Sequence, residues 1–109
     1  MVFETRSVME KEIRLTDVQW LHIQDRHIET GGQLEKMKET LQKPDFVDYD
    51  AQEDVYHYLK KFQKTPVTRK FMLVVVKHLN GDGFVITSFF ISIPKMEGKE
   101  RRYENQYFD

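Results

Sequence analysis

The sequence predicts a single α+β domain in which an N-terminal helical hairpin packs on an antiparallel β-sheet of three to four strands. Apolar side chains recur at helical spacing over residues 16–42. After Pro44 the spacing changes to period two, which is typical of strands. A chain of 109 residues is long enough for one hydrophobic core, so residues 1–109 are expected to form one domain.

The first predicted helix covers residues 16–29. Thr16 and Gln19 have the spacing of a capping box, in which a hydroxyl and a side-chain amide satisfy free backbone groups of the first turn. A glycine pair follows and ends the apolar pattern. We expect this helix to contact the sheet through three apolar side chains: Trp20, Leu21 and Ile28.

The second predicted helix covers residues 33–42. Its apolar side chains lie three and four residues apart, which places them on one helix face: Leu34, Met37 and Leu41. Pro44 prevents the helix from continuing. The two helices are therefore expected to form an αα hairpin.

The remaining elements are predicted strands. Residues 70–79 and 84–93 are rich in β-branched and aromatic side chains, and the Asn-Gly-Asp-Gly turn between them is typical of an antiparallel hairpin. Residues 46–49 are expected to form a short edge strand and residues 12–15 another strand. Residues 55–62 alternate like a strand, although a helix remains an alternative there.

Two further features of the predicted fold are the C-terminal segment and the sheet face that carries no helices. Residues 95–109 are charged and poor in aliphatic side chains, so a flexible C-terminal tail is expected. With helices on one face of an antiparallel sheet, the other face is expected to be solvated and to offer a surface for a ligand.

Composition excludes several classes of site and location. The chain has no cysteine, which excludes disulfides, thiolate nucleophiles and the usual structural zinc sites. The histidines and carboxylates do not follow a metal motif, so neither a metal nor a cofactor is expected. No apolar run reaches the roughly 18 residues of a membrane span, and the first twelve residues lack the signal-peptide pattern. A cytoplasmic location is therefore expected.

The charge of the chain is unevenly distributed, although the net charge is only -1. Residues 55–81 contain six basic and no acidic side chains, which favours a phosphate-binding surface. The candidate RNA-binding cations are Lys60, Lys61, Lys64, Arg69, Lys70 and Lys77. Tyr58 is a candidate for stacking on an unpaired base. The alternatives are that the lysines protect sheet edges from aggregation and that the tyrosine packs in the core.

Several short motifs carry a family resemblance. They are Ile13-x-Leu15-Thr16-x-x-x-Trp20-x-His22-Ile23-x-x-Arg26-His27, Leu41-x-x-Pro44-Asp45, the strand 73–77 and the strand 85–87. Together they resemble phage-associated nucleases of the barnase, EndoU, colicin-D and RelE-like superfamily. The resemblance implies an N-terminal helical part, a four-stranded antiparallel sheet and metal-independent RNA cleavage. Phe89 stands where that pattern commonly has tyrosine, so a role for a tyrosine there is lost.

The candidate catalytic residues are His27, His22, Arg26 and Thr87. Metal-independent RNA cleavage needs a base for the 2′-hydroxyl proton, a cation for the phosphorus oxygens and an acid for the leaving oxygen. On a helical wheel His22 and Arg26 lie about 40° apart, whereas His27 falls on a different face beside apolar residues. We favour His27 as the base. The alternatives are a half-buried structural histidine at 27 and a solvated helix face at 22 and 26.

Two functions follow from these residues. One is a toxin-like or phage-associated endoribonuclease, with RNA as substrate and an antitoxin or other protein as a further partner. The other is a catalytically inactive module that binds RNA or a protein. The positions of these residues in the folded protein separate the two functions. A nuclease needs His27 or His22, Arg26, a basic strand residue and Thr87 around one concavity, whereas a binding module does not.

Overall fold

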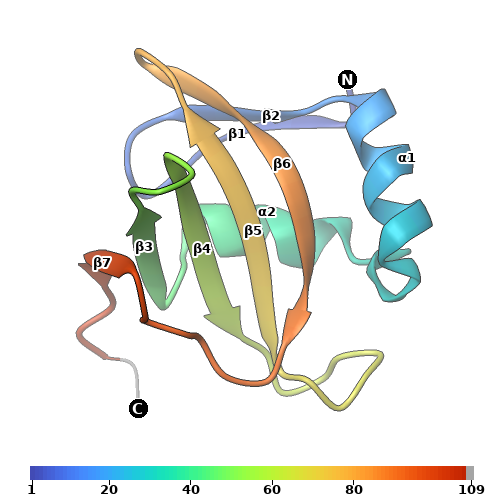
Figure 1. Cartoon of the computed structure of the whole chain (residues 1–109). Helices are drawn as coiled ribbons and strands as arrows, with labels where there is room; N and C mark the ends of the chain where they lie inside the picture. Colours follow the sequence, from blue (N-terminus) through green and yellow to red (C-terminus); the bar gives the residue numbers. More distant parts are fainter. Residues whose placement is uncertain (108–109) are drawn as a thin grey trace.

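The structure, a computed structural model, describes residues 1–107, and within them the chain forms a seven-stranded mixed sheet with two α-helices (Figure 1). The strands are β1 (Phe3–Arg6), β2 (Glu12–Leu15), β3 (Phe46–Asp50), β4 (Val55–Lys61), β5 (Phe71–His78), β6 (Asp82–Ile91) and β7 (Lys99–Glu104). The helices are α1 (Asp17–Arg26) and α2 (Leu34–Gln42), with a 3-10 turn at Ile28–Thr30. The sheet order is β1-β2-β6-β5-β4-β3-β7.

The predicted fold class is wrong in two respects. The sheet has seven strands rather than three to four, and it is mixed because β2 pairs with β6 in parallel. The helices do not form an N-terminal hairpin: β1 and β2 precede them, α1 lies beside β6, and α2 packs against β4 and β5 behind the sheet (Figure 1). The parallel pairing joins segments about 70 residues apart, so no local pattern could reveal it.

Helix α1 is shorter than predicted. Thr16 caps it as expected, because its hydroxyl accepts a hydrogen bond from the Gln19 backbone N–H. The helix ends at Arg26, since His27 leaves the helical conformation with φ −133° and ψ 77°. The expected sheet contacts through Leu21 and Ile28 are wrong, because these side chains are 68% and 87% exposed. The contact with the core comes instead from buried Ile23 and partly buried Trp20.

The predicted strands after the helices are confirmed, with differences at the sheet edge. β5 and β6 pair as an antiparallel hairpin, and residues 55–61 form a strand rather than a helix. β3 is not an edge strand, because β7 pairs with its free side. β7 lies inside the segment expected to be a flexible tail, where alternating charged side chains resemble a polar loop. Residues 108–109 of that segment lie outside the described part.

Both faces of the sheet carry apolar clusters. The cluster on the face that α2 covers includes Ile13, Ile23, Met37, Leu41, Tyr58, Val74 and Phe90. The cluster on the opposite face is built from Val55, Leu59, Phe71, Leu73 and Val75, with Ile86, Phe89 and Ile91 packed against it. A solvated second face was expected, but this face carries buried apolar side chains instead. Among the described residues, no helix is long and apolar enough to cross a membrane.

A β-bulge in β6 changes the side-chain alternation beside the helix. Residues 85–87 lie opposite residues 75–76 of β5, so β6 carries one extra residue at Ile86. The β5 partner of Thr87 has its side chain in the apolar cluster opposite α2, and Thr87 therefore projects to that side. Ser88 projects to the other side, where its buried hydroxyl donates to a backbone carbonyl of β5.

A polar network lies inside the α2 side of the core. The hydroxyl of fully buried Tyr58 donates to Ser7 Oγ over 2.9 Å and lies 2.8 Å from His78 Nε2. The Tyr56 ring stacks on His78 with 3.8 Å between ring centroids. Burial, together with the Lys11 charge, lowers the pKa of His78 to about 4. His78 is therefore neutral in the folded protein at pH 7.

Stability is expected to fall on acidification because of His78. Its folded pKa of about 4 lies below the usual 6.5, so the unfolded chain binds its proton first. The stabilising contribution is complete above pH 6.5 and is lost as the pH falls toward 4, by about 2–3 kcal/mol. Urea unfolding at pH 7 and pH 5 measures it. His78→Gln should be less stable than the parent at pH 7, and the difference should shrink at pH 5; a constant difference contradicts the assignment.

Candidate active site between α1 and β6

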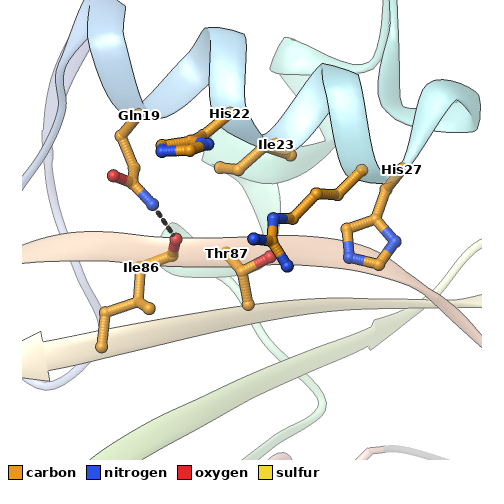
Figure 2. A pocket seen from close by; sticks show the side chains of 7 residues that line it. Gln19, His22, Ile23, His27, Ile86 and Thr87 are labelled. Carbon is orange, nitrogen blue, oxygen red and sulfur yellow. Dashed lines mark hydrogen bonds between the residues drawn. The ribbon is translucent and has the colours of Figure 1, made fainter.

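A cavity of about 460 Å³ lies between α1 and the edge of β6, and we call it the α1–β6 hollow. Its lining consists of Gln19, His22, Ile23, Arg26, His27, Ile86 and Thr87. β2 pairs only with residues 82–84 of β6, so α1, rather than another strand, lies beside the rest of that edge (Figure 1). The Gln19 amide donates to the Ile86 carbonyl and ties the helix to the bulge (Figure 2).

Both candidate histidines line this hollow. His22 is an exposed side chain of α1, and His27 is the residue that ends the helix. The wheel placed them on different helix faces, but a wheel does not apply to His27, because this residue lies just outside the helix, and both residues line the same cavity. Figure 2 shows His22 and His27 on the helix side of the cavity, and Thr87 on the neighbouring strand β6. The His27 ring stacks on Phe89 with 4.5 Å between ring centroids, which restrains its orientation.

Thr87 reaches the hollow because of the bulge. In a regular strand its side chain would alternate to the α2 side, whereas the extra residue at Ile86 turns it toward α1. Such bulges are frequent beside active sites because they re-aim one side chain. Thr87 is half-buried and lines the hollow. Arg26 is exposed and supplies the positive charge of the lining.

A second cavity continues from His27 along β6, and we call it the Arg69 hollow. His27 and Phe89 line it together with Glu29, Arg69 and Lys95. Arg69 lies two residues before β5 and is the one predicted RNA-binding cation that lines a described cavity near the histidines. The two hollows share His27, so a ligand that extends from one to the other passes this imidazole.

The sequence matches one nuclease family over residues 2–108, described as phage-Barnase-EndoU-ColicinE5/D-RelE like nuclease2. The chain belongs to this family. No curated protein and no solved structure matches the sequence. The resemblance read from the short motifs is therefore confirmed, and membership supports a nuclease function in general.

The other predicted RNA-binding cations of this phage nuclease-like chain do not line the α1–β6 hollow. Lys60 is on the α2 side, where it donates to the Lys43 carbonyl and lies 3.8 Å from Glu39. Lys77 lies on β5 two residues from the Thr87 partner Val75, but its ammonium group pairs with Asp54 over 2.6 Å. The remaining three, Lys61, Lys64 and Lys70, line none of the described cavities around the histidines. Of the six predicted RNA-binding cations, Arg69 therefore has the most direct link to the candidate site, because it lines a cavity together with His27.

Tyr58 is not available to stack on a base. Its side chain is 0% exposed, because burial in the core favours the ring and the network described above satisfies its hydroxyl. Burial also raises the pKa of this phenol. The alternative of core packing is therefore the correct interpretation of this tyrosine. Among residues 1–107, no three His, Asp or Glu side chains gather as a metal site.

Three residues of the site region were missed or misassigned from sequence. Gln19 was assigned to the capping box, but its side chain bonds the β6 edge instead. Phe89 was assigned to packing, although it follows Thr87 by two residues on the same strand face and supports His27. That period-two spacing is a signal that could have identified it. Lys95 lies in the expected tail, and its place in the Arg69 hollow depends on the path of the chain after β6.

Proposed function

We propose that the protein is a metal-independent endoribonuclease that cleaves RNA in the α1–β6 hollow by attack of a 2′-hydroxyl on the adjacent phosphate. The observation that carries the proposal is the convergence of His22, Arg26, His27 and Thr87 on one cavity in a chain of this nuclease family. These side chains supply a base, an acid and cationic or hydroxyl contacts for a phosphate. If these side chains were scattered over the surface, they could not act together on one phosphate.

His27 is the general base in this mechanism. Its imidazole removes the 2′-hydroxyl proton, and the alkoxide oxygen then forms a bond to phosphorus. The stacking contact with Phe89 supports this role, because a base must hold its nitrogen in hydrogen-bond reach of the hydroxyl. His27 also lines both cavities, so RNA running between them would bring a ribose beside it.

Arg26 and His22 complete the reaction. Charge builds on the nonbridging oxygens in the transition state, and the Arg26 guanidinium stabilises it while the Thr87 hydroxyl donates a hydrogen bond. Protonated His22 gives its proton to the 5′-oxygen as that oxygen leaves phosphorus. One product ends in a 2′,3′-cyclic phosphate and the other in a 5′-hydroxyl.

Cleavage of an RNA pool tests the proposal. Purified protein in excess EDTA is expected to shorten RNA and to leave DNA of the same sequence intact, because DNA has no 2′-hydroxyl. Cleavage of both polymers contradicts the mechanism. No cleavage of any RNA, with retained binding, favours the inactive RNA-binding module.

The cations of the site are expected to determine the salt dependence of RNA binding. Each phosphate contact contributes about one unit to the slope of log affinity against log salt. Arg69→Ala should reduce this slope by about one unit, because Arg69 lines the cavity next to His27. Lys77→Ala removes the same charge from a lysine already paired with Asp54 and should leave the slope unchanged. Anisotropy titrations with 2′-O-methyl RNA measure both slopes; equal slopes for the two variants contradict this assignment.

A further inference from the structure

A third cavity of about 240 Å³ lies on the sheet face opposite α2, and we call it the His57 hollow. Its floor is apolar and comes from the three central strands, with Leu59 of β4, Leu73 of β5 and Ile91 of β6. Its polar lining comes from His57, Lys95 and Lys99, of which Lys95 lies in the segment that connects β6 to β7 and Lys99 is the first residue of β7. An apolar floor with a cationic rim suits a ligand that is planar and apolar in one part and anionic in another.

His57 supplies the group in this hollow that can recognise a polar edge. Burial and the nearby Lys99 charge lower the pKa of His57, so the ring is neutral at pH 7. A neutral imidazole offers one N–H donor and one nitrogen acceptor. Three carboxylates act on His57 in the opposite sense, Asp50 most strongly, then Asp48, which forms an ion pair with Arg101, and then Glu53. None of the three lines the hollow, whereas Lys95 and Lys99 do.

The His57 hollow adjoins the Arg69 hollow, which in turn adjoins the candidate active site. Phe89, Ile91 and Lys95 line both it and the Arg69 hollow, and the Arg69 hollow in turn shares His27 with the α1–β6 hollow. Phe89 thus lies between the reactive imidazole, on which it stacks, and the third cavity. The Arg69 hollow between them is lined by two cations, Arg69 and Lys95, and by one acidic residue, Glu29. Phosphate contacts alternating with apolar base pockets are how proteins hold single-stranded RNA.

We propose that the His57 hollow binds one unstacked base of the RNA strand near the cleaved linkage and that this contact positions the scissile phosphate at His27. The inference rests on the proposed function and deepens it by naming a base-recognition subsite. The cavity is smaller than those that enclose drug-sized ligands, which fits a single base rather than a larger group. Lys95 contacts the phosphate beside the base, and His57 pairs with its polar edge.

An abasic scan tests the subsite without cleavage. Short 2′-O-methyl RNA oligonucleotides, each lacking one base, are titrated against the protein by fluorescence anisotropy. In the parent protein, loss of the base at one position near the bound linkage should lower affinity about tenfold, as expected when a stacked base is lost. Ile91→Trp fills the cavity and should abolish this penalty. Leu79→Trp adds the same ring at the β5–β6 turn and should retain it.

The result that overturns the inference is a scan with no penalised position or a penalty that survives in Ile91→Trp. Titrations with each of the four bases at the penalised position measure the preference of the hollow for one base over another. His57→Phe keeps a planar ring but loses the ring nitrogens, so this preference should fall to about twofold or less. Unchanged preference also overturns the inference. A parent that shows the penalty but cleaves no RNA refutes the nuclease and retains the subsite. Cleavage without a penalised position refutes the subsite alone.

Discussion

His27→Ala is expected to reduce the rate of RNA cleavage by about two orders of magnitude or more, which is the usual cost of losing a general base. The fold should survive, because His27 lies at the end of α1 and is only partly buried. Initial rates on a short RNA, with circular dichroism to confirm folding, measure the effect. The loss should appear in kcat, because the imidazole acts on the reacting proton.

Two comparisons make this result specific. His22→Ala removes the proposed acid from the same cavity and should lower the rate by a similar factor. Asp25→Ala changes an exposed neighbour in α1 that is not part of the α1–β6 lining, and it should cleave at the parent rate. If well-folded His27→Ala and His22→Ala proteins both keep the parent rate, the two-histidine mechanism is wrong.

Arg26→Ala is expected to lower kcat by about 10²–10³-fold, the range seen when one preorganised transition-state contact is removed. Binding of 2′-O-methyl RNA should change much less, because the strongest contact forms only when charge builds on the phosphate. Arg26→Lys keeps the charge but loses the bidentate geometry, so an intermediate rate is expected. Parallel cleavage and binding measurements give the comparison.

The outcome that would contradict this role is a change in binding that accounts for the whole loss of activity. In that case Arg26 would hold the substrate equally in its ground and transition states. A fully active Arg26→Ala protein would remove the residue from the mechanism altogether.

Local patterns predicted the central part of the fold and missed its edges. The β5–β6 hairpin and α2 were predictable because turn residues and apolar spacing act over a few positions. β1 was missed, since four residues with alternating polar side chains carry little signal. The parallel pairing of β2 with β6 and the pairing of β7 with β3 are long-range events. Contacts between distant residues, rather than local preference, stabilise such pairings, as in the ion pair of Arg101 in β7 with Asp48 in β3.

In the site, as in the fold, local features were predictable and features that depend on the folded structure were not. His22 and Arg26 share a helix face by spacing alone, so their proximity was predictable. The position of His27 in the α1–β6 hollow depends on where α1 ends, and that of Thr87 depends on the bulge at Ile86. The sequence pattern locates neither of these features. The basic block is a count along the chain, and such a count does not give positions in space. In the structure Lys60 lies on the α2 side, whereas Arg69 lines a cavity together with His27.

The most direct test of the central claim uses a DNA oligonucleotide that contains a single ribonucleotide, incubated with the protein in excess EDTA. Attack by a 2′-hydroxyl predicts one cut, directly 3′ of the ribonucleotide, with a 2′,3′-cyclic phosphate on one fragment and a 5′-hydroxyl on the other. Mass spectrometry of the fragments identifies both ends. Cutting at any other position, fragments with 5′-phosphates, or an intact oligonucleotide when the all-RNA strand is cleaved would contradict it.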